Sequence, residues 1–185
     1  MKKISLSHIS EMIESVKAFF SYNFPEKVEL FTIDRNEINS NNLGDLFPEL
    51  AKALKSVSRE IFIRGYKMTS SDLEILLKNA RNCKKVKLFD CEIDTSTQIH
   101  IESDEPYAIE ILDLERCGKY SKWKDNLESV KNLIDAIDAS SLKTSLKEIA
   151  ISDCDIDIAT FKDILFEKGI TTIDITENTN WDQED

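Results

Sequence analysis

The sequence predicts an α/β fold, a right-handed solenoid of strand–helix units with a parallel sheet on its concave face and helices on its convex face. Three observations predict this fold. One spacing of apolar residues occurs six times along the chain, segments of helical period follow most copies, and an apolar stripe at residues 6–20 precedes the first copy. The stripe predicts an N-terminal capping helix.

The repeated spacing is clearest at residues 146–156. Leu146, Ile149 and Ile151 are followed by Cys154 and Ile156, and the residues between them are free to be polar. Alternation of this kind predicts a short strand with one buried face. The position of Cys154 recurs in five other copies, at Asn36, Tyr66, Cys91, Cys117 and Asn178.

This pattern resembles the leucine-rich repeat, and the helical segments between copies make it most similar to the ribonuclease-inhibitor type. The resemblance covers roughly residues 27–178. It implies a structural ladder along one side of the solenoid, in which each side chain lies under the turn that leaves its strand and interacts with the backbone there. Tyr66 departs from the Asn or Cys of the pattern, so we expect a local backbone adjustment at this position.

The first 26 residues are assigned to the capping element. Its stripe has apolar residues at steps of three and four, and Leu6 and Phe20 mark its two ends. We expect a helix that covers the open edge of the first strand and the exposed end of the core. The alternative is a docking helix for another protein.

Amphipathic segments follow every copy except the third. Strand followed by helix, repeated, predicts parallel strands joined by right-handed crossovers. The segments contain Leu50 and Leu54, Leu73 to Leu77, Val130 to Ile137, and Phe161 to Leu165. Residues 94–108 instead show Ile99 and Ile101 alternating with polar residues, so we expect an irregular or extended crossover there.

The composition indicates one acidic domain. Among 185 residues, 24 lysines and arginines stand against 35 aspartates and glutamates, a formal net charge of -11. This charge disfavours a phosphate backbone or an anionic membrane as the principal partner. The sequence shows no signal-peptide pattern and no apolar run long enough to span a membrane, so we expect an intracellular, cytoplasmic protein. Residues 27–178 form the solenoid, and residues 179–185 form an acidic tail.

The sequence indicates no cofactor, metal or catalytic site. Cys91, Cys117 and Cys154 share one template position and lack metal-ligand spacing, which predicts a stack of buried, reduced thiols. Aspartates 153, 155 and 157 alternate as in a calcium loop, but Ile158 and Ile164 occupy the positions where Gly and Glu are required. No nucleophile motif lies near either histidine, so we expect no enzyme.

One loop is both basic and aromatic. Residues 118–126 are inserted between the fourth strand and its helix and contain Tyr120, Trp123 and three lysines. Such a loop is able to stack on nucleic acid. We favour packing of Trp123 against its own helix, and expect no nucleic-acid partner.

The outward positions of the six strands form the predicted binding surface. Its first half carries more cations and its second half more carboxylates, so we expect an electrically graded face. Phe62 and Phe89 project from adjacent strands and predict one apolar spot. The predicted protein-binding residues are Arg35, Phe62, Arg64, Lys87, Phe89, Asp113, Glu115, Arg116, Asp153, Asp174 and Glu177.

These features predict a non-catalytic protein–protein interaction module. It is expected to be a structural or scaffold subunit of a larger assembly, binding through the concave face or the C-terminal edge, where Trp181 is the one large apolar residue after Ile175. The alternative is a regulatory, inhibitory or ubiquitin-ligase-type recognition protein that binds a basic partner through its acidic face.

Overall fold

The computed structural model describes residues 2–7, 18, 27–34, 47–95, 97–101, 106–117, 127–154 and 158–177. Within these ranges the buried apolar side chains form one core that extends from Val28 to Ile173. None of the described helices is long and apolar enough to cross a membrane.

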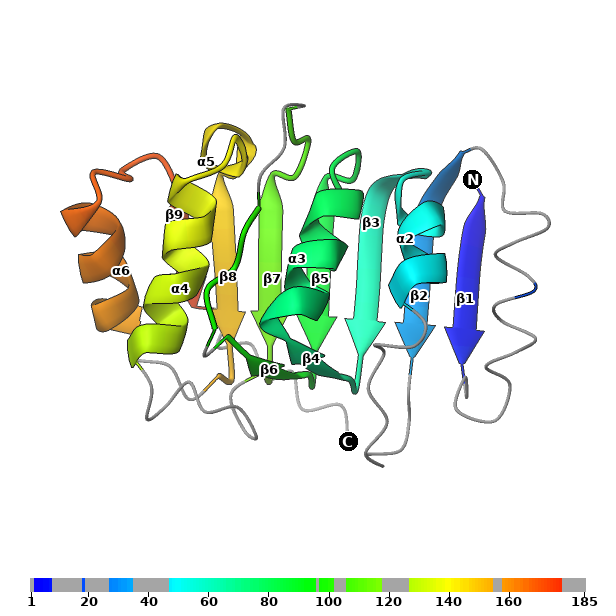
Figure 1. The fold of residues 1–185 in the computed structure, drawn as a ribbon, viewed down its shortest axis with the longest axis horizontal. Helices are drawn as coiled ribbons and strands as arrows, with labels where there is room; N and C mark the ends of the chain where they lie inside the picture. The colour runs from blue at the N-terminus through cyan, green and yellow to red at the C-terminus, as the bar shows by residue number, and fades with distance from the viewer. Residues whose placement is uncertain are drawn as a thin grey trace.

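Seven strands form one parallel sheet, and their spatial order is their order along the chain (Figure 1). The sheet is open, because β1 and β9 form its two edges and do not pair with each other. The strands are β1 (Lys3–Ser7), β2 (Val28–Asp34), β3 (Val57–Arg64), β5 (Lys85–Phe89), β7 (Ile111–Glu115), β8 (Glu148–Ser152) and β9 (Asp174–Glu177). Residues 60–64 pair in parallel with residues 85–89, and residues 67–69 pair in parallel with residues 92–94, as expected for the second and third copies of the repeated spacing.

Helices cover one face of this sheet (Figure 1). They are α2 (Phe47–Leu54), α3 (Ser70–Asn79), α4 (Leu127–Asp138) and α6 (Ile158–Glu167), with α5 (Leu142–Ser145) as a single turn before β8. The third connection has no helix in its described residues, and Ile99, Ile101 and Tyr107 are buried along it. The predicted irregular or extended crossover is therefore confirmed for the part of residues 94–108 that the structure describes.

The core lies between the helices and the sheet. Alternate strand residues point toward the helices and are at most 1% exposed: Phe31, Ile33, Ile61, Ile63, Val86, Leu88, Leu112, Leu114, Ile149 and Ile151. Helix residues on the predicted stripes, including Leu76 and Phe161, are fully buried against them. Burial of this apolar area is the main favourable contribution to folding.

The N-terminal edge differs from the sequence prediction. Residues Lys3–Ser7 form a strand that pairs in parallel with β2, so the expected helix does not begin at Leu6. Ile4 and Leu6 alternate with polar residues, and the backbone hydrogen bonds offered by the edge of β2 favour the strand over the helical stripe. Apart from Ala18, the remaining predicted helix lies outside the described residues.

A second, two-stranded sheet follows two of the main strands. β4 (Lys67–Thr69) pairs in parallel with β6 (Glu92–Asp94), and Met68 and Ile93 at its centre are fully buried. Across this pair Lys67 Nζ lies 2.8 Å from Glu92 Oε1. The sequence template contained both apolar residues, but it did not separate them into strands of their own.

A capping box starts α3. Thr69 Oγ1 accepts a hydrogen bond from the Asp72 backbone N–H at 3.3 Å, and the Thr69 N–H donates to Asp72 Oδ2 at 2.9 Å. We expect Thr69→Ala to lower the free energy of unfolding by about 1 kcal/mol, because the Asp72 N–H loses its side-chain acceptor and Asp72 Oδ2 loses the Thr69 hydroxyl as a donor. Thr69→Ser keeps the hydroxyl and is the matched control. Urea denaturation that finds the two variants equally stable would contradict the cap.

Candidate functional site

The same turn ends four consecutive strands of the main sheet. Gly65, Asp90, Arg116 and Asp153 each have a positive φ, between 49° and 75°. At the first three, the backbone N–H donates to the carbonyl of the last residue of the next strand, over 3.0, 2.8 and 2.8 Å. The turn therefore repeats in backbone conformation as well as in sequence spacing.

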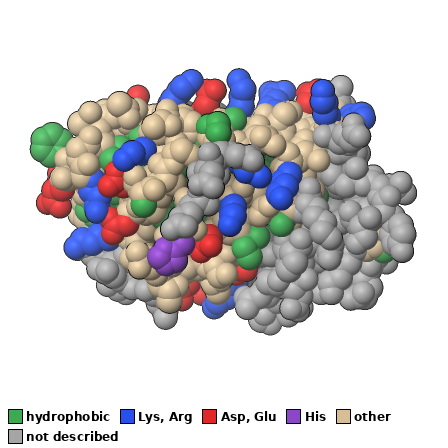
Figure 2. All heavy atoms as spheres, turned by 45° about the horizontal axis from the view of Figure 1, so that its top comes forward, with side chains coloured by type: hydrophobic (Ala, Val, Ile, Leu, Met, Phe, Trp, Pro, Cys, Tyr) green, Lys and Arg blue, Asp and Glu red, His purple; other side chains and the backbone are tan. Residues whose placement is uncertain are grey.

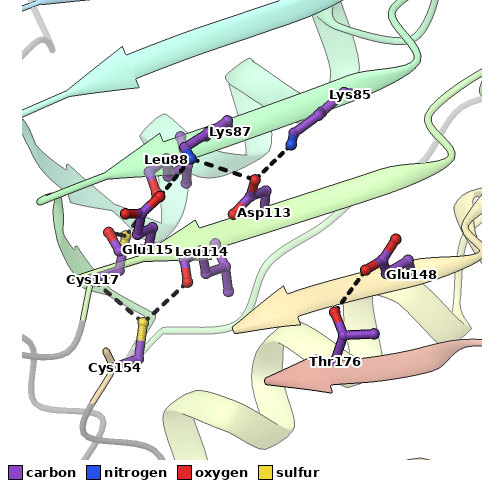
Figure 3. Close-up of polar contacts among 10 residues, drawn as sticks. All are labelled: Lys85, Lys87, Leu88, Asp113, Leu114, Glu115, Cys117, Glu148, Cys154 and Thr176. Atoms are coloured by element: carbon purple, nitrogen blue, oxygen red, sulfur yellow. Dashed lines mark hydrogen bonds and ion pairs between the residues drawn. The ribbon is translucent and has the colours of Figure 1, made fainter. Parts of the chain in front are cut away.

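The residue after each positive-φ position belongs to the predicted ladder. Cys117 Sγ donates to the Leu88 carbonyl at 3.3 Å, Cys154 Sγ donates to the Leu114 carbonyl at 3.3 Å, and Cys154 Sγ accepts from the Cys117 N–H at 3.3 Å (Figure 3). Cys91 Sγ contacts the carbonyls of Ile63 and Phe89 in the same way. The predicted interaction of these side chains with backbone is confirmed for the three cysteines.

These cysteines form no disulfide, and burial keeps Cys117 in the neutral form. Burial raises the pKa of Cys117 well above its ordinary value, and the neighbouring Cys154 and Cys91 raise it further. Among the described residues, no group of three or more His, Cys, Asp or Glu side chains is placed to hold a metal ion.

Two further ladder predictions have different outcomes. Tyr66 is only 5% exposed and follows Gly65, whose φ of 75° matches the equivalent turns, so the special backbone adjustment expected there is not observed. Asn36 and Asn178 lie outside the described residues.

The face of the sheet opposite the helices, here called the open face, carries three rows of side chains that cross the paired strands. The amino row contains Lys3, Leu30, Glu60, Lys85, Ile111, Glu148 and Asp174. The middle row contains Ser5, Thr32, Phe62, Lys87, Asp113, Ala150 and Thr176. The carboxyl row contains Ser7, Asp34, Arg64, Phe89, Glu115 and Ser152.

Phe62 and Phe89 contact each other on this face, with ring centroids 6.2 Å apart, which confirms the predicted apolar spot. Three cations surround the Phe89 ring. Arg64 lies 5.0 Å, Arg116 5.5 Å and Lys87 5.9 Å from its centroid. These five residues are called the aromatic–cation cluster below. Each cation–π contact of a partly exposed pair contributes about 0.5–1 kcal/mol.

The two arginines of the cluster are held loosely by carboxylates. Arg64 Nε lies 3.8 Å from Asp34, and Arg116 lies 3.8 Å from both Asp90 and Asp153. These distances are too long for hydrogen bonds. Arg116 Nε is also buried and has no hydrogen-bond partner among the described residues. The partly exposed parts of the two guanidinium groups therefore keep hydrogen-bonding capacity at the open face.

Lys85 and Lys87 are held tightly instead. Lys85 Nζ lies 2.7 Å from Asp113 Oδ2, and Lys87 Nζ lies 2.5 Å from Glu115 Oε2 and 3.7 Å from Asp113 (Figure 3). Burial opposes the charged form of Lys87, but the hydrogen bond to Glu115 and the charge of Asp113 together raise its pKa. These ion pairs join β5 to β7. In them Lys87, expected in the cationic half of the face, is neutralised by Asp113 and Glu115, expected in the acidic half.

The predicted charge gradient is correspondingly weaker than expected. Asp113 is 4% exposed, so it is a buried ion-pair partner and not part of an accessible acidic zone. The remaining acids of the last two strands include Asp174, which is exposed, and Glu148, which accepts a hydrogen bond from Thr176 at 2.6 Å (Figure 3). Arg35 and the side chain of Glu177 lie outside the described residues.

A different distribution of charge is seen at one end of the sheet. Lysines and arginines gather along the rim formed by the amino ends of the strands (Figure 2). There Lys147 and Lys84 lie 2.9 and 3.8 Å from Glu110, and the hydrogen bond and charge of Lys147 lower the pKa of this exposed carboxyl. Such exposed pairs are screened by water and salt and contribute little to stability.

The comparisons with known proteins give no indication of what this surface binds. No protein-family model and no curated protein matches the chain. The function therefore has to be argued from the described side chains, of which the aromatic–cation cluster is the most distinctive group.

Arg116 is the unusual member of the repeated turn, because a positive φ favours Gly, Asn or Asp and is costly for other side chains. We expect Arg116→Asn to be more stable than Arg116→Ala by about 1 kcal/mol. Both substitutions remove the contacts with Phe89, Asp90 and Asp153. The difference in stability between the two variants therefore reports the cost of the positive φ alone. Equal stabilities in chemical denaturation would argue against the left-handed turn.

Proposed function

We propose that the chain is a leucine-rich repeat βα solenoid of the ribonuclease-inhibitor-like type. Three features support this proposal: the spatial order of the strands is their chain order, one positive-φ turn ends four of them, and cysteines at equivalent positions contact backbone carbonyls of neighbouring strands. Helices on one face of the sheet are consistent with it.

We infer that the protein acts without catalysis, as a structural or scaffold subunit that binds a protein partner through the open face. The aromatic–cation cluster is the observation that carries this proposal. Aromatic residues and arginine are the side chains that most often dominate binding energy at interfaces. Here Phe62 and Phe89 project from paired strands, so a partner meets them with little loss of side-chain or backbone freedom.

The cluster also offers polar recognition. The long ion pairs of Arg64 and Arg116 leave guanidinium N–H groups for acceptors on the partner. The alternative, an inhibitor or ubiquitin-ligase-type recognition protein that binds a basic partner through an acidic zone, has weaker support, because Asp113 and Glu115 are already paired with lysines.

The test compares what co-purifies with the tagged full-length chain from its native cells, at low and high salt. The Phe62→Ala/Phe89→Ala double variant is expected to lose a defined assembly that the wild type keeps at both salt concentrations. Ile75→Ala is the control, because Ile75 is a partly buried apolar residue of α3, away from both the cluster and the edges of the sheet.

Circular dichroism and thermal unfolding establish that the double variant is folded. An assembly that dissociates in high salt and ignores both phenylalanines would favour the acidic-zone alternative. An assembly retained by the folded double variant at both salt concentrations would overturn the proposed site.

A further inference from the structure

The two edges of the main sheet leave backbone groups without a strand partner among the described residues (Figure 1). On β9, the Asp174 N–H donates to the Lys147 carbonyl at 2.8 Å, on the side of β8. Backbone groups of successive strand residues point to alternate sides, so the N–H and carbonyl of Ile175 point to the outer edge.

The outer edge of β1 offers backbone N–H and carbonyl groups at the positions that pairing with β9 requires. The Lys2 carbonyl accepts from the Glu29 N–H at 3.0 Å, on the side of β2, so the backbone groups of Lys3 and Ser5 point outward. In a parallel pair with Ile175 opposite Ile4, the Ile175 N–H would donate to the Lys3 carbonyl, and the Ser5 N–H would donate to the Ile175 carbonyl.

The side chains match in the same register. Lys3 and Asp174 both belong to the amino row and would lie opposite each other with opposite charges, and both are exposed. Ser5 would lie opposite Thr176 in the middle row. Opposite charges and paired hydroxyl residues are favourable neighbours across strands.

The apolar side chains of the two edges also match. Ile4, Leu6 and Ile175 are only partly buried, although they pack against the core, because each lies on an edge strand. Ile4 and Ile175 point to the helix-covered side, so the same pairing would bury both and keep the helices of two molecules on one face.

A groove beside β9 adds apolar surface next to this strand edge. It has a volume of about 440 Å³ and lies between α6 and β9, with Leu165, Phe166, Ile170, Ile173 and Ile175 among its lining residues. Phe166 is 75% exposed beside it. An exposed strand edge next to apolar surface is a recognised template for pairing with another chain.

We propose that copies of this chain associate head to tail, with β9 of one molecule pairing in parallel with β1 of the next. This contact uses the edges of the sheet and leaves the open face free, so it is independent of the proposed function. The two surfaces differ, which makes the contact heterologous: each molecule keeps one free edge for the next copy. The net charge of -11 opposes association at long range, so the contact is expected near physiological ionic strength, where that repulsion is screened.

Sedimentation velocity of the full-length chain, from micromolar to millimolar concentration, tests this. The wild type is expected to form dimers and longer species as concentration rises. Ser5→Pro removes the outward N–H at an edge position that tolerates proline, and should abolish association without unfolding. Asp174→Lys should weaken it about five- to tenfold, and Lys3→Asp combined with Asp174→Lys should restore it.

Mixing identifies the polarity of the contact. Ser5→Pro keeps a normal β9 and Asp174→Lys keeps a normal β1, so the mixture is expected to form heterodimers at concentrations where Asp174→Lys alone stays monomeric. A wild type that stays monomeric at every concentration would overturn the proposal. So would a folded Ser5→Pro variant that associates like the wild type, or a charge swap that fails to restore association.

Discussion

Replacing Phe161 by alanine is expected to lower the free energy of unfolding by about 3–5 kcal/mol. Phe161 is fully buried on the inner side of α6, where it is among the largest side chains of the core. Its truncation removes the transfer free energy of the ring and leaves a cavity that the close-packed surroundings fill only in part. Urea denaturation followed by circular dichroism measures this loss.

Phe166→Ala provides a control in the same helix. Phe166 is 75% exposed, so its loss is expected to change stability by no more than about 0.5 kcal/mol. Both substitutions exchange the same residue types at helical positions, so burial is the main difference between them. Similar losses in the two variants would show that α6 does not pack on the sheet through Phe161.

Stability is also expected to fall steeply in alkaline solution. Cys83 is fully buried, and burial raises its pKa from 9.0 to about 12. The thiol is an acid with a higher pKa in the folded protein, so the unfolded chain loses its proton first. The stabilisation is therefore complete below about pH 9 and is lost as the pH rises toward 12. This thiol contributes up to about 1.4 kcal/mol per pH unit in that window.

Urea denaturation at a series of pH values from about 8 to 11 measures this slope. Lysines and tyrosines also titrate there, so the informative quantity is the difference between the wild type and Cys83→Ala. The free energy of unfolding of the variant is expected to fall less steeply with pH. The reason is that the variant lacks the Cys83 proton, which the wild type releases on unfolding in this pH range. Cys117, whose pKa burial also raises, continues to act in the same direction in both proteins. Identical slopes would contradict the burial of Cys83.

Apolar spacing was sufficient to predict most of the main sheet. Residues such as Ile149 and Ile151 alternate without competing patterns, and Cys91, Cys117 and Cys154 occupy equivalent positions in three successive copies. The edge strand β1 was missed because Leu6 also fits a helical stripe with residues farther along the chain. The neighbouring strand decided between these two periodicities, and a local pattern does not contain that information.

The site was predictable in its aromatic residues but not in its charges. Phe62 and Phe89 fall at outward positions of adjacent strands, so the spacing places them together. The approach of Arg116 to Phe89 depends on a positive φ that arginine does not favour, so the sequence gives no local indication of it. The burial of Asp113 depends on Lys85, which the pattern did not place on the binding surface.

The chain order of the strands has a consequence for synthesis. Every main-sheet strand after β1 pairs with the main-sheet strand that precedes it in the chain, so its partner has already left the ribosome when it emerges. Translation adds only about 5–20 residues per second, whereas elementary structure forms in microseconds. The sheet is therefore able to grow from β1 to β9 one strand at a time during translation, and no early strand has to wait for a distant C-terminal segment.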